Sequence, residues 1–495
     1  MHHDRIAERF RNKITSAEHA AEIIKDGMVV GASGFTKAGD PKATLLALAA
    51  RAKKNPLKIN LMTGASLGHN LDGLLAEANA LSRRMPFQAD PSLRKKINNG
   101  EVMFTDPHLG ETAELLAYGF LPSVDIAVIE VAAIYEDGSV LPTTSVGNNL
   151  TYARHAKQII LEVNTTVPLE IRGFHDIFAT GLSPQRQIIP VTEANTRIGT
   201  ETMPMDPEKI VAVVVSDLKD SPIELTSVDD KTQAISNHLM EFFKDEVKKG
   251  RLTSQLPPLQ TGIGNIANAV FSGFKNGPFE NLRMYSEVLQ DSTFELLDSG
   301  KMSFASACSF AVTEKCYENF FANLDKYRGK VLLRPEKISN SPEVIRRLGV
   351  IAINTAIEFD LYGNVNSTHI GGNKMMNGIG GSGDFARNSY LSIFVTQSAS
   401  KNNSISHVVP MVTHVDSNEH DVDILVTDQG LADLRGLAPR ERAPLVIENC
   451  CHPEYRDQLK AYYEEALVRG GHTPHIIERA FSWHQNFNER GTMKL

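Results

Sequence analysis

Four short runs of the chain are largely apolar along their whole length. They span residues 58–62, 124–131, 159–163 and 210–215. A strand that is apolar on both faces belongs to a sheet that helices cover on both sides. None of the runs approaches the roughly 20 apolar residues of a membrane-spanning helix. The sequence therefore predicts an α/β architecture.

The first 50 residues show the order of elements that such an architecture needs. Thr15 and Glu18 have the spacing of a capping box, which begins a helix. A short apolar strand at 28–30 then runs into a small-residue loop at 31–34, and Pro41 precedes the next helix. The pattern of strand, small-residue loop and helix is typical of α/β folds.

A polar segment at 216–230, which contains Pro222, separates two parts of the chain. We place the domain boundary there and predict α/β domains at 1–220 and 221–495. The second part repeats the order strand, loop and helix over 259–274. We also predict a helix at 232–249, strands at 282–286, 350–355 and 422–427, and a helix start at Ser341-Pro342.

Composition excludes several classes of protein. With 495 residues the chain is long enough for two to three domains. Its net charge of −8 argues against a nucleic-acid-binding protein, which usually carries a basic excess. The acidic N-terminal region lacks the apolar run of a signal peptide, and none of the four cysteines forms a C-x-x-C pair. We therefore expect a cytoplasmic protein with no nucleic-acid or membrane partner.

Two glycine-containing loops could bind a ligand. Residues 262–267 read G-x-G-x-x-A, which fits either a dinucleotide fingerprint, with Glu287 as its ribose-binding carboxylate, or a tight turn. Residues 371–383 contain six glycines and the apolar side chains of Met375, Met376 and Ile379. The segment is either a loop whose backbone approaches a ligand closely or a flexible surface loop. Its N–H groups could form an oxyanion hole.

Glu287 is a third candidate. It follows an apparently buried strand and precedes two apolar residues. A carboxylate there is costly to desolvate unless it is paired or used in a reaction. From its position alone, Glu287 fits a structural ion pair as well as a catalytic role.

Five segments, taken in order, strongly resemble the acetyl-CoA hydrolase/transferase family of class I CoA-transferases. They are GIGNIANAV at 262–270, YSEVLQD at 285–291, GGNKMMNGIGGSGDF at 371–385, VTDQGLADLRG at 426–436 and GHTPH at 471–475. The resemblance implies two related open α/β domains with the active site in a cleft between them, and with the nucleophile and the CoA loops both in the second domain, 221–495. It also implies acyl-CoA and short carboxylic acids as substrates, no permanently bound cofactor, and a homodimer.

The resemblance also implies roles for particular residues. Glu287 falls on the family's nucleophile and Asn340 on an active-site asparagine, and the backbone N–H groups of Ile263 and Gly381 would stabilise the oxyanion. Asp428 stands where many relatives have glutamate, which leaves its contact open. The expected CoA contacts are Gly262, Ile263, Gly264, Asn265, Ile266, Asn377, Gly381 and Lys401.

We therefore expect an enzyme that moves CoA between short carboxylic acids through a glutamyl-CoA thioester, with succinyl-CoA and acetate as substrates. An acyl-CoA hydrolase on the same scaffold is the alternative, and a dinucleotide-binding protein is a more remote one. His472 and His475 form H-x-x-H without a nearby acidic cluster, so we do not predict zinc. Asn148 and Asn149 fit a plain turn or one wall of a carboxylate pocket.

Overall fold

The computed structural model describes residues 4–495, and the chain folds into two compact units. Unit 1 comprises Met1–Glu224, Met284–Asp291 and Phe304–Arg347, and unit 2 comprises Leu225–Arg283, Ser292–Ser303 and Leu348–Leu495. The chain first leaves unit 1 inside the polar segment at 216–230 and then returns to it twice. The division into domains 1–220 and 221–495 stays a prediction.

Unit 1 is built on a parallel eight-stranded sheet with the order β1-β10-β9-β6-β2-β3-β4-β5. All four apolar runs form strands of this sheet, which confirms that prediction. The strands are β1 (Ile14–Thr15), β2 (Val29–Ala32), β3 (Ile59–Met62), β4 (Leu81–Met85), β5 (Met103–Phe104), β6 (Ile126–Val131), β9 (Gln158–Asn164) and β10 (Ile210–Ser216).

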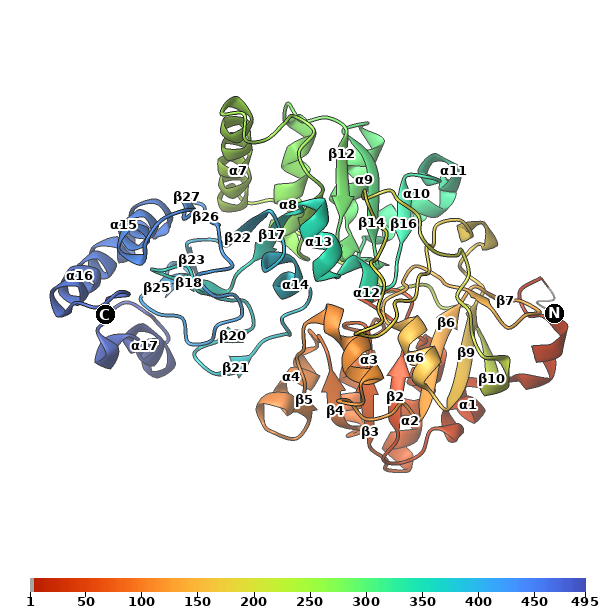
Figure 1. The fold of residues 1–495 in the computed structure, drawn as a ribbon. Coiled ribbons are helices and arrows are strands. Elements are labelled where there is room, and N and C mark those ends of the chain that lie inside the picture. Colours follow the sequence, from red (N-terminus) through yellow and green to blue (C-terminus); the bar gives the residue numbers. More distant parts are fainter. Residues whose placement is uncertain (1–3) are drawn as a thin grey trace. The chain divides into compact units, whose positions relative to one another are not determined.

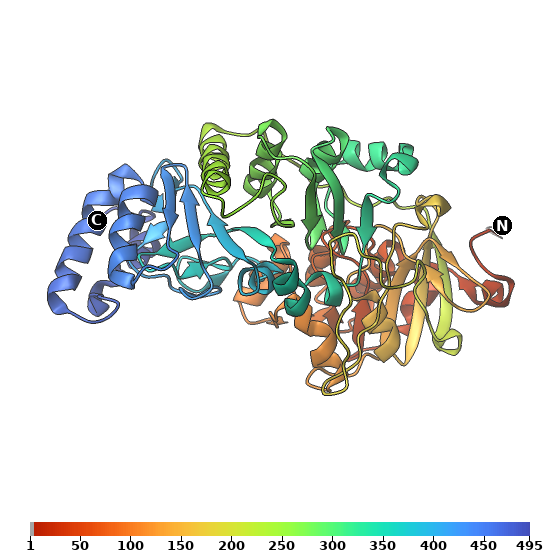
Figure 2. The same cartoon turned by 45° about the horizontal axis from the view of Figure 1, so that its top comes forward.

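Helices cover both faces of this sheet (Figures 1 and 2). Val30 and Ala32 of β2 belong to the hydrophobic core that contains α1, α2 and α3. Gly31 points the other way, where a Cβ would lie 2.7 Å from the ring of Tyr152 on α6. The helices of unit 1 include α1 (Ala17–Ile23), α2 (Lys42–Lys54), α3 (Leu71–Glu77), α4 (Pro91–Asn98), α5 (Thr112–Ala117), α6 (Asn149–His155), α10 (Glu314–Ala322), α11 (Leu324–Tyr327), α12 (Glu336–Ser339) and α13 (Pro342–Leu348).

The predicted capping box at the first helix is wrong by one residue. The N-cap of α1 is Ser16, whose side chain accepts a hydrogen bond from the N–H of His19. Thr15 instead belongs to β1 and pairs with Val214 of β10. The strand pairing takes Thr15 into the sheet, so the next hydroxyl residue caps the helix.

The second sheet has the order β16-β14-β12-β11-β17-β22-β26-β27. The strands β11, β17, β22 and β26 pair in parallel, and β27 closes the edge antiparallel to β26. The strands predicted at 282–286, 350–355 and 422–427 are β12, β17 and β26, and their observed ends differ from the predicted ones by at most two residues. The strands are β11 (Leu259–Thr261), β12 (Leu282–Tyr285), β14 (Met302–Ala307), β16 (Val331–Leu333), β17 (Ile351–Thr355), β22 (Leu391–Val395), β26 (Ile424–Thr427) and β27 (Gly430–Asp433).

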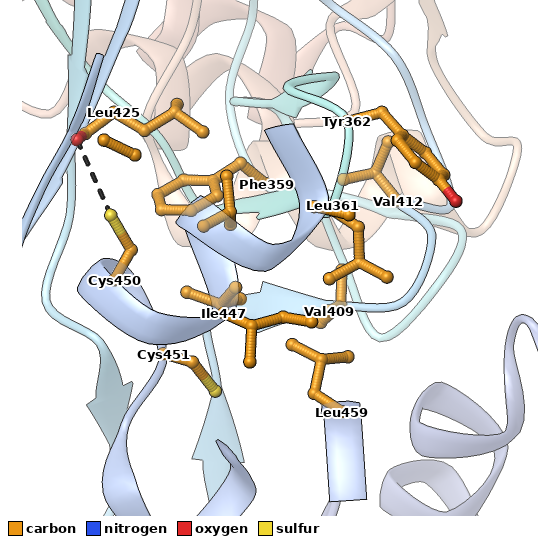
Figure 3. Close-up of a cluster of buried hydrophobic side chains, with 14 of the residues drawn as sticks. Phe359, Leu361, Tyr362, Val409, Val412, Leu425, Ile447, Cys450, Cys451 and Leu459 are labelled. Carbon is orange, nitrogen blue, oxygen red and sulfur yellow. Dashed lines mark hydrogen bonds between the residues drawn. The ribbon is translucent and has the colours of Figure 1, made fainter. Parts of the chain in front are cut away.

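The hydrophobic core of unit 2 lies between strands and the C-terminal helices (Figure 3). Phe359 and Leu425 pack there with Ile447 of α15 and Leu459 of α16. Cys450 is also buried in this core and its thiol contacts the carbonyl of Leu425 at 3.6 Å. The helices of unit 2 are α7 (Asp230–Lys248), α8 (Asn265–Ser272), α9 (Asp291–Asp298), α14 (Ser382–Ala386), α15 (Pro439–Cys450), α16 (Pro453–Arg469) and α17 (Ser482–Arg490).

Two further features concern residues 4–495 as a whole. None of their helices combines the length and apolar character that crossing a membrane requires. All four cysteines are unpaired thiols.

A buried glutamate fastens helix α7 to the edge of the second sheet. The side chain of Glu246 is 2% exposed and forms ion pairs with Arg251 and, at 3.1 Å, with Arg435 beyond β27. The hydrogen bond from Arg251 and the contact with Arg435 lower the pKa of Glu246 from 4.5 to about 2. The folded state therefore holds this carboxylate ionised at pH values where the unfolded chain takes up a proton.

We expect Glu246→Gln to lower the free energy of unfolding at pH 7 by about 1.5–3 kcal/mol, because the three hydrogen bonds that its carboxylate accepts from Arg251 and Arg435 lose their charge assistance. The stabilisation by Glu246 is complete above pH 4.5 and disappears as the pH falls through about 2. Urea unfolding from pH 7 down to pH 3 should therefore show the variant and the parent converging. Glu241→Gln on the same helix is the control, because its pair with Lys244 is exposed. An equal loss in both variants would contradict the prediction.

Candidate active site

Glu287 lies two residues beyond the end of β12, directly before the short strand β13 (Val288–Leu289). It is 6% exposed. Its backbone carbonyl accepts two hydrogen bonds from Cys308, one from the N–H at 2.9 Å and one from the thiol at 3.0 Å. Strand β13 in turn pairs in parallel with β15 (Ser309–Phe310). The backbone of Glu287 is thus fixed on both sides.

The thiol of Cys308 stays protonated at this position. Burial raises its pKa well above the ordinary value, and the neighbouring carboxylates Glu336 and Glu287 raise it further. A protonated thiol can donate to a carbonyl, whereas a thiolate could not. We therefore assign Cys308 to the support of Glu287 and not to a nucleophilic role of its own.

Asn340 holds the carboxylate itself. Its Nδ2 donates to Oε2 of Glu287 at 2.9 Å, and both side chains are buried. Asn340 occupies the C-terminal end of α12, where its N–H bonds to the carbonyl of Glu336. The hydroxyl of Tyr285 donates to the carbonyl of Ile338 at 2.5 Å, which ties the same helix to β12. Two neighbouring elements thus present the amide to the carboxylate.

The segment before α6 supports helix α12 from the other side. The carbonyl of Gly147 accepts the N–H of Glu336 at 2.9 Å, and Asn148 Nδ2 donates to Glu336 Oε1 at 3.1 Å. The N–H of Val146 bonds to the carbonyl of Cys308 at 2.8 Å. Asn148 therefore has a structural contact in unit 1, and its role in a carboxylate pocket stays a prediction.

A buried charge cluster at the carboxyl ends of the first sheet was not predicted from the sequence. Lys42 Nζ lies 2.6 Å from Glu130 of β6 and 2.8 Å from Asp220, and all three side chains are buried. Burial alone would lower the pKa of Lys42, but the carboxylates of Asp220, Glu130 and Asp40 raise it well above its ordinary value. An acidic residue inside the apolar run 124–131 was the available signal, because such a group needs a buried cation.

The first glycine loop of unit 2 connects β11 to α8. Gly262 continues the sheet through its N–H, which bonds to the carbonyl of Ile353 at 2.9 Å. Gly264 has a φ of 117°, a left-handed conformation that favours glycine, and α8 begins at the next residue. Asn265 Oδ1 accepts the N–H of Thr226 at 3.1 Å. The geometry is that of a tight strand-to-helix turn. The dinucleotide interpretation needs the carboxylate of Glu287 for a ribose, but this carboxylate accepts a hydrogen bond from Asn340.

The second glycine loop is largely structured. It begins with the hairpin of β20 (His369–Ile370) and β21 (Lys374–Met375), whose tip carries Gly371 and Gly372 at positive φ. Gly381 then precedes α14 as its N-cap. The side-chain oxygen of Asn377 is buried and lacks a hydrogen-bond partner within residues 4–495. A buried acceptor of this kind suits a donor group on a ligand.

Lys401 stands at the tip of a second hairpin, formed by β23 (Ala399–Ser400) and β24 (Ile405–Ser406). Its φ of 48° is left-handed, and its Nζ lies 5.6 Å from the ring centroid of Phe487. The predicted CoA contacts thus all belong to unit 2, while Glu287 and Asn340 belong to unit 1.

The contact of Asp428, which the sequence left open, is now defined. Its Oδ1 accepts the N–H of Ser398 at 2.5 Å, and its Oδ2 accepts the hydroxyl of Ser398 and the amide of Gln429.

In the H-x-x-H motif, His475 hydrogen-bonds with Tyr462 at 3.0 Å. Within the described part of the chain, no three His, Cys, Asp or Glu side chains group as a metal site.

Two family models match this sequence. The acetyl-CoA hydrolase/transferase N-terminal domain matches residues 1–215, and the acetyl-CoA hydrolase/transferase C-terminal domain matches residues 317–463. The chain belongs to the acetyl-CoA hydrolase/transferase family. The resemblance carried by the five sequence segments is therefore confirmed.

Relatives with established names carry two different activities. A succinyl-CoA:acetate CoA-transferase from Clostridium kluyveri is 47% identical over 489 residues, which cover 98% of this chain and 91% of that protein. An acetyl-CoA hydrolase from Eremothecium gossypii is 44% identical over 98% of this chain and 96% of that protein. A solved 4-hydroxybutyrate CoA-transferase from Porphyromonas gingivalis has the same fold, with a TM-score of 0.64 and 21% identity over 92% of this chain and 99% of that one. The chain is thus an enzyme of the CoA-transferase and hydrolase family with the expected α/β fold.

We expect Asn340→Ala to lower acyl-CoA-dependent turnover by about 10–100-fold, because Glu287 loses the donor that orients it. The free energy of unfolding should also fall by about 1–3 kcal/mol, since a buried acceptor loses its partner. Steady-state kinetics and urea unfolding measure the two effects. Asn164→Ala is the matched control, because it removes the same type of buried bond from Glu130 of β6. Full turnover in a folded Asn340→Ala variant would contradict the assigned role.

Proposed function

We propose that this enzyme transfers CoA between short carboxylic acids through a covalent thioester on Glu287, with succinyl-CoA as donor and acetate as acceptor. The observation that carries the proposal is a buried glutamate whose backbone and carboxylate are both held by hydrogen bonds, at the position of the family's nucleophile. The relative from Clostridium kluyveri supports the choice of substrates.

The first half of the reaction moves CoA onto the enzyme. The Glu287 carboxylate attacks the carbonyl carbon of the acyl-CoA, forming a mixed anhydride and releasing CoA thiolate. The thiolate then attacks the Glu287 carbonyl of that anhydride. The C–O bond breaks, the first carboxylate departs, and a glutamyl-CoA thioester remains. A covalent relay of this kind replaces one difficult exchange by two easier ones.

The second half reverses these steps with the acceptor acid. Its carboxylate attacks the Glu287 thioester, giving a new anhydride and CoA thiolate, and the thiolate attacks the acceptor's carbonyl carbon. The products are the new acyl-CoA and free Glu287, so no proton or electron is gained or lost overall. The reaction as proposed therefore has no step for a metal or a redox cofactor.

The other predicted residues would assist in two ways, by stabilising the oxyanions and by binding CoA. Each attack creates an oxyanion, for which we propose the backbone N–H groups of Ile263 and Gly381 as donors. The buried oxygen of Asn377 is suited to accept from an amide N–H of the pantetheine arm. Lys401 is a cation for the phosphate-bearing end of CoA.

Hydrolysis of the same thioester is the second candidate function, because the relative from Eremothecium gossypii is named an acetyl-CoA hydrolase. Water attacking the glutamyl thioester would regenerate Glu287 and release CoA. The chemistry on the enzyme is shared up to that step, so only the second nucleophile distinguishes the two activities.

The covalent step can be trapped. We expect borohydride, added after succinyl-CoA in the absence of an acceptor, to reduce the Glu287 thioester to a hydroxymethyl side chain that peptide mass spectrometry locates. Glu287→Gln should give no such product and no turnover. Glu295→Gln, an exposed glutamate on α9, is the control and should behave as the parent. Full activity in Glu287→Gln would exclude the mechanism.

The acceptor dependence decides between transfer and hydrolysis. We expect acetyl-CoA to form from succinyl-CoA only when acetate is added, with initial rates that give the parallel double-reciprocal lines of a ping-pong enzyme. Release of free thiol without an acceptor should remain far slower. Thiol release at the same rate with and without acetate would assign the enzyme as a hydrolase.

A further inference from the structure

The C-terminal helix α17 lies beyond residue 463, where the match to the C-terminal family model ends. Two buried residues fasten it to unit 2. The ring centroids of Trp483 and of Tyr455 on α16 lie 5.2 Å apart, and His484 Nε2 lies 2.8 Å from Glu358 Oε2. Figure 1 shows α17 beside α16 at the end of the chain. The helix is thus a fixed part of the unit.

One turn further along, α17 contacts the hairpin of β23 and β24. The partly buried ring of Phe487 packs against the core of unit 2, and the ammonium of Lys401 lies above it at 5.6 Å from the centroid. This distance is within the range of a cation–π interaction. Lys401 itself is exposed and forms no ion pair within the described residues, so its charge is available to a ligand.

The backbone of this hairpin tip is held in an unfavourable conformation. Lys401, Asn402 and Asn403 have φ values of 48°, 54° and 60°, and a lysine pays a larger steric penalty there than asparagine does. Neighbouring groups enforce it: Tyr455 Oη donates to the carbonyl of Asn403 at 2.8 Å, and the N–H of Met493 bonds to the carbonyl of Ser404 at 2.7 Å. Strain that the surrounding structure enforces is typical of ligand-binding positions.

The same helix also reaches the other predicted CoA segment. Asn488 Nδ2 donates to the carbonyl of Gly371 at 2.9 Å, at the tip of the hairpin that opens the glycine-rich loop. Consecutive residues of α17 therefore contact both hairpins. Two exposed cations, Lys374 on that hairpin and Arg490 at the end of α17, form no ion pair within residues 4–495.

We infer that Phe487 is a positioning residue, which holds the Lys401 ammonium in place for the phosphate groups of CoA. A lysine side chain loses much rotamer freedom when it binds an anion. A ring beneath the ammonium restricts the side chain before the ligand arrives, so less freedom is lost on binding. The inference rests on the proposed function, because it takes an acyl-CoA as the ligand.

Substitution of Phe487 tests the inference. We expect Phe487→Leu, which keeps the apolar packing but removes the π face, to raise KM for succinyl-CoA about two- to fivefold with kcat unchanged. Phe487→Trp should restore the parent KM, because its ring binds cations better. Succinyl-pantetheine lacks the phosphates, and its KM should not change in any of these variants. Phe481→Leu is the control, because Phe481 is the N-cap at the opposite end of the same helix.

A double-mutant cycle separates positioning from structure. In a Lys401→Ala background, Phe487→Leu should have no further effect on KM, because its action passes through the missing ammonium. An additive effect there, a loss of kcat at unchanged KM, or an equal rise in KM for succinyl-pantetheine would overturn the inference. Calorimetric titration with free CoA gives the same comparison without turnover. A failure of the Glu287 trap would contradict the proposed function while leaving this binding result intact.

Discussion

Two hydrogen bonds from Cys308 to one carbonyl oxygen, and a third from Asn340 to the carboxylate, hold Glu287 where it lies. A buried carboxylate is unfavourable in an apolar environment, so a donor must meet it in the folded state. The donors to the backbone carbonyl and to the carboxylate of Glu287 come from segments far apart in sequence: Cys308 follows β14, and Asn340 ends α12. The loop before α6 bonds to both of these segments, at Val146 and Asn148. Glu287 is therefore positioned by the tertiary structure of unit 1 as a whole.

This convergence explains why unit 1 is discontinuous in sequence. The two returns to it, Met284–Asp291 and Phe304–Arg347, are the segments that carry Glu287, Cys308 and Asn340. A change in composition reveals where a chain becomes polar and exposed, as it does at 216–230. It does not reveal which sheet a later apolar strand will pack against, because that depends on contacts between distant residues.

The sequence predicted the features that depend on local pattern. Continuous apolar runs identified the strands, and the cost of burying a charge drew attention to Glu287. It did not predict features that depend on distant partners. Thr15 does not cap the first helix, because it pairs with Val214 of β10 as part of a strand. The ion pair of Lys42 with Glu130 and the contact of Lys401 with Phe487 join residues from separate elements. An acidic residue in an apolar run signals that a cation is needed, but spacing along the chain does not identify which residue supplies it.

A transferase and a hydrolase can share all of these features. In the mechanism we propose, both pass through the same glutamyl thioester, and the outcome depends on whether a carboxylate or water reaches its carbonyl carbon. Water is present at far higher concentration, so transfer requires its exclusion while the thioester persists. Excluding water is a property of packing around a site and can change with few substitutions. Relatives at 47% and 44% identity over nearly the whole chain carry different names, so overall similarity does not separate the two activities.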